Sequence, residues 1–271
     1  MKKTVISLII SLLLITGTFL SAQEGQNVKF TIIYDNTVHK EDLTQDWGFA
    51  CLVESEEKNI LFDTGTKPEI LVENMEKLKI GFNISEMVII SHNHPDHTGG
   101  LQEYLSKNSH VPVYLPASSP DDFINLINGK SDRVILKPDP YEVCRGVYLT
   151  GEMGTTIKEQ SMVFDLGDKI VVMTGCAHPG IVNIVKRAKE IANKDISLVF
   201  GGFHLMNYSE AQINNIIGEF RKMGVQKCGA THCTGEKQIE MFRKAFGKDF
   251  VELGAGKVLN FKDGDLMNTI Q

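Results

Sequence analysis

The sequence predicts an α/β protein built from two similar halves. Apolar runs of strand length alternate with segments whose apolar residues recur at helical spacing. Residues 87–90 form one such run, which is followed by a histidine-rich turn and a helix that starts near Gly99. Residues 169–173 repeat the pattern, since they lead to His178 and then to an expected helix over 181–192. Two strand–histidine–helix units in one chain indicate two pseudo-symmetric halves.

Three strands and a helix are expected before the histidine-rich turn. Residues 28–34 alternate between apolar and polar positions, and the strands 49–53 and 59–62 are separated by a charged turn. The third strand ends in Asp63, and a helix follows it. The loop before the second strand carries Trp47, the only tryptophan. This side chain is expected either to form an aromatic wall for a substrate or to pack in the core.

The histidine-rich turn has the sequence SHNHPDHTGG over residues 91–100. It places three imidazoles and one carboxylate within six positions, and these belong to His92, His94, Asp96 and His97. The turn follows a buried strand, and open α/β sheets place their sites outside the carboxyl ends of strands. Imidazole and carboxylate groups suit zinc, and also iron or manganese. The turn therefore predicts a metal site.

The remainder of the chain is expected to add an insertion and a second set of strands and helices. Residues 110–160 contain only short predicted elements and are interpreted as an insertion that shapes a substrate pocket. His204 follows a buried strand, and His232 precedes the last helix. The expected elements beyond the insertion are, in order, strands 162–166 and 169–173, helix 181–192, strand 196–200, helices 209–223 and 235–246, and strands 250–253 and 258–261.

The pattern H-x-H-x-D-H after a strand resembles the signature of the metallo-β-lactamase superfamily. Asp63, His178 and His232 match its outlying motifs in order, so the resemblance covers essentially all of residues 23–271. It implies a four-layer αββα sandwich. It also implies that Asp63 hydrogen-bonds a metal-ligating imidazole from behind. One metal is expected to be held by His92, His94 and His178, and a second by Asp96, His97 and His232.

This ligand set predicts a catalytic centre with one or two Zn²⁺ ions, with iron or manganese as alternatives. Three protein ligands for each ion leave a position open for water, which is typical of a catalytic zinc site. Coordination lowers the pKa of water to about 7. We therefore expect a metal-dependent hydrolase that uses a metal-bound hydroxide on an ester, phosphoester, lactone or amide of a small molecule. Asp96 is expected to take part in catalysis as well as in metal binding.

One departure from the superfamily pattern concerns His204. Many relatives carry a metal-bridging Asp after the strand between the third and fourth histidine motifs. Residues 200–205 of this chain read FGGFHL and contain no carboxylate. We expect His204 to act in catalysis or to replace that ligand, whether as a ligand, a proton donor or a phosphate contact, and a buried structural histidine is the alternative.

The sequence motifs TGCAHPGI, GGFHL and THCTG resemble those of one branch of the superfamily, the dihydropterin ribofuranosylaminobenzene 5′-phosphate synthase-like proteins. A transferase of that kind is therefore one alternative function. An exported metallo-β-lactamase is a second alternative function, because the secreted metallo-β-lactamases that this chain resembles also carry H-x-H-x-D-H. A metal- or ligand-binding module without turnover is the third.

Residues 1–22 have the features of a secretory signal peptide. Lys2 and Lys3 precede an apolar stretch that is short for a membrane span, and residues 20–22 are suited to cleavage. The mature domain is thus expected to comprise residues 23–271, in the periplasm or outside the cell, without a stable membrane anchor.

The acidic composition argues against nucleic acid as a partner. Because residues 1–22 carry two lysines and no acidic residue, the net charge of −6 becomes −8 for residues 23–271. The five cysteines leave at least one free thiol. Cys176 and Cys233 are expected either near the metal or each other, or as small buried residues. The sequence contains no signal for an oligomeric state.

Overall fold

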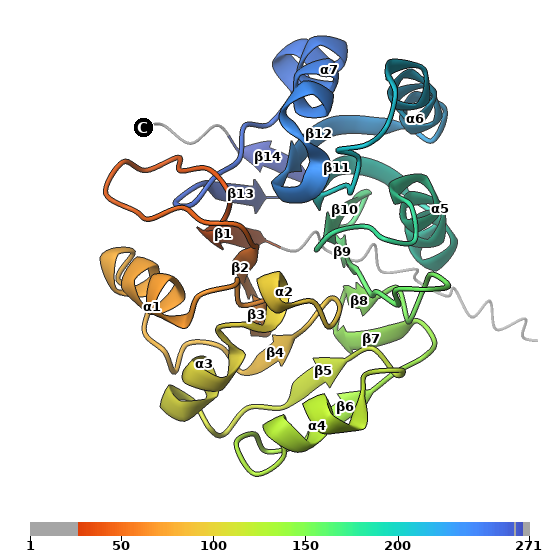
Figure 1. Cartoon of the computed structure of the whole chain (residues 1–271). Helices are drawn as coiled ribbons and strands as arrows, with labels where there is room; N and C mark the ends of the chain where they lie inside the picture. Colours follow the sequence, from red (N-terminus) through yellow and green to blue (C-terminus); the bar gives the residue numbers. More distant parts are fainter. Residues whose placement is uncertain (1–26, 263, 268–271) are drawn as a thin grey trace, which may run out of the picture.

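The structure is a computed structural model that describes residues 27–262 and 264–267 (Figure 1). The signal peptide expected over residues 1–22 therefore lies outside the described residues. Among the helices that are described, none has both the length and the apolar character needed to cross a membrane.

Two sheets form the centre of the fold. The first has the strand order β14-β13-β1-β2-β3-β4-β5-β6, and the second has the order β12-β11-β10-β9-β8-β7. Strands β3 to β6 are mutually parallel, as are β10, β11 and β12. The strands of the first sheet are β1 (Val28–Tyr34), β2 (Ala50–Ser55), β3 (Asn59–Phe62), β4 (Met87–Ile89), β5 (Val113–Leu115), β6 (Val134–Leu136), β13 (Val258–Lys262) and β14 (Asp265–Met267). Those of the second are β7 (Tyr141–Cys144), β8 (Val147–Leu149), β9 (Met162–Asp165), β10 (Lys169–Thr174), β11 (Asp195–Gly202) and β12 (Val225–Thr231).

Helices cover the outer faces of both sheets (Figure 1). An apolar cluster packs α1 and α3 on the first sheet, and another packs α5, α6 and α7 on the second. The helices are α1 (Pro68–Lys77), α2 (Pro95–Thr98), α3 (Leu101–Lys107), α4 (Asp121–Ile127), α5 (Ile181–Ala192), α6 (Glu210–Lys222) and α7 (Glu236–Phe246), with the 3₁₀ turns η1 (His232–Thr234) and η2 (Gly247–Asp249).

A third apolar cluster joins the inner faces of the two sheets. Phe30 of β1 packs edge-on against Phe164 of β9 and Phe200 of β11, with ring centroids 4.8 and 5.1 Å apart. Such aromatic contacts add to the apolar area that the two sheets remove from water. The layers are therefore helix, sheet, sheet and helix, and the predicted αββα sandwich is confirmed.

The segment 110–160, expected as an insertion, is built into both sheets. Strands β5 and β6 extend the first sheet in parallel register, and β7 and β8 pair antiparallel at the edge of the second. Because the segment supplies strands to each half, it carries the chain from one sheet to the other. The boundary of the domain at residue 23 stays a prediction.

Two expectations for the strands differ from the structure. The predicted strand 250–253 is wrong, because this segment makes only a single bridge, from Phe250 to Cys228. Gly254 then turns the chain with a φ of 147°, a conformation that favours glycine. Strand β7 was not expected, since the prolines at 138 and 140 give its start the character of a loop.

Candidate metal centre

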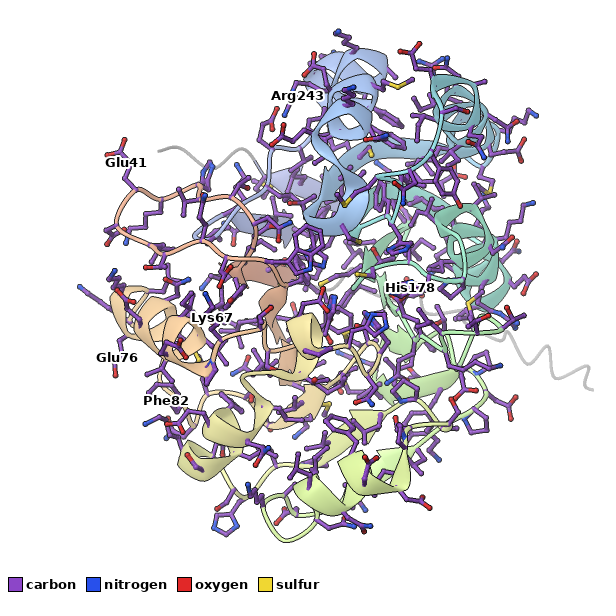
Figure 2. The ribbon with its side chains drawn as sticks, in the orientation of Figure 1. Glu41, Lys67, Glu76, Phe82, His178 and Arg243 are labelled. Atoms are coloured by element: carbon purple, nitrogen blue, oxygen red, sulfur yellow. The ribbon has the colours of Figure 1, made fainter. Side chains whose placement is uncertain are left out.

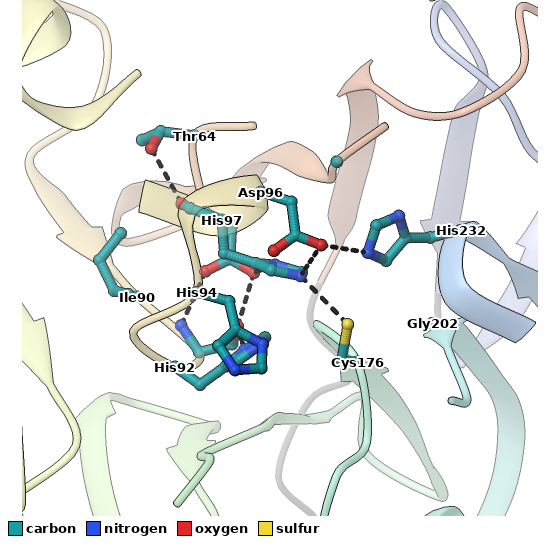
Figure 3. A network of polar contacts seen from close by, with 12 residues as sticks. Thr64, Ile90, His92, His94, Asp96, His97, Cys176, Gly202 and His232 are labelled. Atoms are coloured by element: carbon teal, nitrogen blue, oxygen red, sulfur yellow. Dashed lines mark hydrogen bonds and ion pairs between the residues drawn. The ribbon is translucent and has the colours of Figure 1, made fainter. Parts of the chain in front are cut away.

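The predicted site residues lie where several strands of the two sheets end (Figure 3). The turn after β4 carries His92, His94, Asp96 and His97, with α2 beginning directly after His94. The turn after β10 carries His178, and the one after β12 carries His232 in η1. The carboxyl ends of the parallel strands thus meet at one edge, where side chains of both halves converge. Figure 2 shows His178 near the junction of the two halves.

Three histidines form the first ligand group. The donor atoms of His92, His94 and His178 lie within 4.8 Å of one another, as an ion held by all three requires. His92 Nε2 is 3.1 Å from His94 Nδ1, and His92 Nδ1 is 2.9 Å from Ser91 Oγ. The Nε2 atom of His178 is buried and has no hydrogen-bond partner among the described residues.

The second ligand group contains Asp96, His97 and His232, together with Cys176. Asp96 Oδ2 lies 3.6 Å from His97 Nε2 and 3.3 Å from His232 Nε2. His97 Nε2 also lies 3.2 Å from Cys176 Sγ. The structure therefore brings together all six residues predicted as metal ligands and adds a thiol to the second group.

Residues behind the ligands fix the orientation of two imidazoles. Asp63 Oδ2 accepts a hydrogen bond from His97 Nδ1 at 2.7 Å, while Asp63 also accepts from the backbone N–H and hydroxyl of Ser91. His232 Nδ1 is 2.9 Å from Asn36 Oδ1. Because each Nδ1 atom is engaged, each Nε2 atom faces the ligand group. Asp63 has the place that the resemblance implied, whereas sequence reasoning missed Asn36.

The turn that carries Cys176 and His178 is held by a buried carboxylate. Glu159 accepts hydrogen bonds from three successive backbone N–H groups, those of Cys176, Ala177 and His178, at 2.8 to 2.9 Å. The Glu159 side chain is buried, and burial raises its pKa to about 7. Sequence reasoning missed this residue, because no pattern links a carboxylate to backbone groups 17 to 19 positions later.

Burial and charge set the protonation of the ligands. Burial, together with the neighbouring imidazoles of His97 and His178, lowers the pKa of His92. Burial, together with the neighbouring imidazoles of His204 and His94, lowers the pKa of His178 to about 3. Burial would also lower the pKa of His97, but the negative charge of Asp63 outweighs it and raises that pKa to about 9. The first group therefore presents neutral imidazoles, which is the form that binds metal.

Four site residues other than glycine have backbone conformations in the left-handed region. They are Asp63, Ala177, His204 and His232, with φ angles of 55°, 63°, 53° and 51°. Such conformations are uncommon outside glycine and cluster at functional sites. The fold thus accepts a local backbone cost at several turns that position the site.

Trp47 lies over the site and not in the core. Its indole Nε1 donates a hydrogen bond to Asp96 Oδ2 at 2.9 Å, and its ring centroid is 5.0 Å from that of His232. The side chain is 44% exposed. The expectation of core packing is therefore wrong, and the exposed ring forms part of the wall around the second ligand group.

His204 is exposed at the rim of the site. Its ring centroid lies 4.2 Å from that of His178. Its donor atom also falls within 4.8 Å of the sulfurs of Cys176 and Cys233, whose thiols are both free. The alternative of a buried structural histidine is wrong, because the side chain stands beside the ligands and reaches solvent.

The donor set fits a divalent cation. Imidazole, carboxylate and thiol groups are the ligands that zinc uses in proteins. The buried Nε2 atom of His178 has no hydrogen-bond partner among the described residues, and a cation in the first ligand group would satisfy it. A pocket of about 250 Å³ opens next to His94. The arrangement can therefore hold one or two cations beside a space for a small molecule.

Known proteins resemble this chain over most of its length. Residues 48–188 match the family described as the Metallo-beta-lactamase superfamily. The chain is 30% identical to the 7,8-dihydropterin-6-methyl-4-(beta-D-ribofuranosyl)-aminobenzene-5′-phosphate synthase of Methanocaldococcus jannaschii, over 87% of this chain and 97% of that protein.

Two solved structures are also similar. Tm1679, described as a metal-dependent hydrolase of the beta-lactamase superfamily, matches with a TM-score of 0.72 and 27% identity, over 86% of this chain and 98% of that one. The metallo-beta-lactamase fold protein YhfI from Bacillus subtilis matches with a TM-score of 0.64 and 15% identity, over 85% of this chain and 98% of that one. The second likeness concerns the fold alone.

Proposed function

The chain belongs to the metallo-beta-lactamase superfamily, and we propose that it is an exported zinc-dependent hydrolase of a small polar molecule. The scissile bond is an ester, phosphoester, lactone or amide. The observation that carries the proposal is the pair of adjacent ligand groups, one with three histidines and one with Asp96, His97 and His232. The similarity of the chain to Tm1679, which is described as a metal-dependent hydrolase, supports the reaction class.

The residues of the site have distinct tasks in this proposal. His92, His94 and His178 hold the first cation, and Asp96, His97 and His232 hold the second. A bound Zn²⁺ acts as a Lewis acid and lowers the pKa of coordinated water to about 7. Asp63 keeps the Nε2 atom of His97 turned toward the site by accepting a hydrogen bond from Nδ1.

His204 is the proton donor in this proposal. Its ring stands beside His178 and is exposed at the rim of the site. A hydrogen bond with Cys233 raises the pKa of His204 above its ordinary value, and this effect outweighs that of partial burial, which lowers the pKa. A protonated imidazole at this place can give a proton to the leaving group of a hydrolysed substrate.

The pocket beside His94 supports a small polar substrate. Its lining includes Asn93, the hydroxyl residues Ser118, Ser119 and Thr156, and the cationic Lys158. Hydroxyl and amide groups with one cation suit an anionic oxygen-rich group, so we place phosphoesters first among the four bond types. The exposed ring of Trp47 borders the second ligand group and offers an apolar surface to the remainder of the substrate.

A screen of purified residues 23–271 tests the proposal. The metal-free protein is reconstituted with zinc and assayed with p-nitrophenyl phosphate mono- and diesters, a γ-lactone, a thioester and nitrocefin. We expect turnover of at least one phosphoester, lost after zinc removal and in His94→Ala. Zinc binding without turnover of any of these probes would favour a binding module, and clear nitrocefin turnover alone would favour a β-lactamase.

A transferase similar to the Methanocaldococcus jannaschii synthase is the second candidate, because that protein is 30% identical to this chain over most of both chains. Formation of the ribofuranosyl-aminobenzene phosphate product for which that relative is named, without turnover in the hydrolysis screen, would favour this candidate. The export proposed below would place the chain outside the cytoplasm, which argues against this candidate.

We further propose that residues 1–22 direct export to the periplasm or outside the cell and that the mature protein acts on a small molecule and not on nucleic acid. The basis is the charged start, the apolar stretch and the acidic composition of the remainder. Cell fractionation and N-terminal sequencing of the native protein test this, and an intact Met1 on protein in the cytoplasm would contradict it.

A further inference from the structure

A thiol occupies one side of the second ligand group. Cys176 Sγ lies 3.2 Å from His97 Nε2, and it falls within 4.8 Å of the donor atoms of Asp96 and His232 as well. Figure 3 shows the sulfur and the Asp96 carboxylate facing the same nitrogen of His97. The four donor atoms thus surround one place from four side chains.

The position of this thiol is fixed by the fold. Its backbone N–H is one of the three that Glu159 binds, and its residue is buried. Cys176 forms no disulfide in the structure. The imidazoles opposite it have their Nδ1 atoms engaged by Asp63 and Asn36, so their Nε2 atoms are the ones turned toward the sulfur and the carboxylate.

The end of β11 cannot supply a ligand side chain at this place. Gly202 stands there, and a Cβ atom on it would lie 2.3 Å from the carbonyl oxygen of Gly175 and 2.8 Å from Cys233 Sγ. The Gly202 N–H also donates to that carbonyl at 3.1 Å, so the two backbones are in direct contact. Any carboxylate at position 202 would have to displace backbone. A fourth protein donor at this place would therefore have to come from another element.

We propose that Cys176 is the fourth protein ligand of the second cation, as a thiolate beside Asp96, His97 and His232. Four protein ligands close this position, since zinc sites with four protein ligands are the closed kind. The position of His92, His94 and His178 has three and stays the open one, where a substrate group or water enters. A thiolate also makes the second position select zinc, cobalt or cadmium over manganese and magnesium.

The neighbouring thiol is a matched comparison for Cys176. Cys233 is equally buried and lies in the same site, but its sulfur belongs with Cys176 and His204 and not with Asp96, His97 and His232. Its S–H points to the backbone carbonyl of Cys176 at 3.5 Å. Replacement of Cys233 should therefore leave the proposed ligand shell complete.

Cobalt substitution tests the assignment. Metal-free residues 23–271, kept reduced, are titrated with Co²⁺, and both bound cobalt and the near-ultraviolet thiolate-to-cobalt charge-transfer absorption are recorded. We expect two bound ions and this absorption in the wild type and in Cys233→Ser. Cys176→Ser should lose the absorption and the second ion but keep the first, and Cys176→Asp should regain the second ion without the absorption.

Three results would overturn the assignment. They are the absence of thiolate absorption from the wild type, its persistence in Cys176→Ser, and its loss in Cys233→Ser, which would place the cation at Cys176, His204 and Cys233. Loss of both ions from Cys176→Ser with an unchanged far-ultraviolet circular dichroism spectrum would also count against a role confined to the second position. The inference rests on the proposed metal centre but not on turnover, so a protein with thiolate absorption and no hydrolysis would separate the two.

Discussion

The most informative single substitution is Glu159→Gln. The carboxylate accepts two N–H groups on Oε1, from Cys176 and Ala177, and one on Oε2, from His178. A glutamine can keep the first two on its amide oxygen, but its NH₂ group would then face the N–H of His178. One buried donor left without an acceptor costs about 1–3 kcal/mol. Glu159→Ala strands all three donors and should cost roughly 3–9 kcal/mol, comparable to the entire stability of about 5–15 kcal/mol typical of a domain.

The Gln variant should also bind zinc less well. The turn that Glu159 holds carries both His178 and Cys176, and loss of a group that orients metal ligands lowers affinity by about 10- to 100-fold. Urea unfolding of the metal-free protein measures the stability, and competition with a chromophoric chelator measures zinc affinity. The control is Glu76→Gln on α1, an exposed position away from the site (Figure 2), where the change should stay within about 0.5 kcal/mol.

The same variant tests the effect of burial on Glu159. Because burial raises the pKa of Glu159 from 4.5 to about 7, the native state holds a proton in this range that the unfolded state has lost. The free energy of unfolding of the metal-free wild type should therefore fall as pH rises from about 4.5 to 7, by about 3 kcal/mol from this group. Glu159→Gln should lack this part of the slope. A variant with wild-type midpoint, zinc affinity and pH slope would refute the reasoning on Glu159.

The remaining predictions concern residues that contact the ligands. Asp63→Asn removes the charge that faces His97 Nδ1, so zinc affinity should fall by about 10- to 100-fold in the chelator competition; wild-type affinity would contradict this. The raised pKa of His97, about 9, also means that Asp63 stabilises the metal-free protein below about pH 6.5 and that this stabilisation disappears as pH rises through 9, which urea unfolding of wild type and Asp63→Asn can compare. Trp47→Phe loses the hydrogen bond to Asp96 but keeps a ring, and kcat/KM should fall about five-fold, equivalent to about 1 kcal/mol; an unchanged value would exclude a contribution from the indole N–H. His94→Ala and Asp96→Ala should each abolish turnover and lower metal content with a native circular dichroism spectrum, and full turnover in either would contradict the ligand assignment.

The parts of the molecule that the sequence predicted are those with short-range patterns. The strand before His92, the spacing of the four ligands after it, and the repeat of strand, histidine and helix around His178 all lie within stretches of 10 to 25 residues. The spacing of apolar residues identifies the elements in such stretches, because one face of each element is buried. The four-layer fold then followed from the family resemblance and agrees with the two sheets and their helices.

The residues that were missed act across the chain. Asn36 reaches His232 over 196 positions. Trp47 was expected as a possible wall of the site, but its hydrogen bond to Asp96, 49 positions away, was not predicted. Glu159 binds backbone groups, which carry no side-chain signal at all. The thiol of Cys176 was recognised only as near the site, because its approach to His97 depends on how the two halves pack. Sequence patterns predict which turns hold ligands, whereas the packing of those turns against each other decides which side chains complete them.

In the proposed metal centre, side chains from both halves converge to hold cations. Anomalous diffraction at the zinc absorption edge, from crystals of residues 23–271 grown with zinc, measures this directly. We expect one peak among His92, His94 and His178 and a second among Asp96, His97, His232 and Cys176. A map with no peak in contact with either group, from protein that retains its fold, would contradict the account.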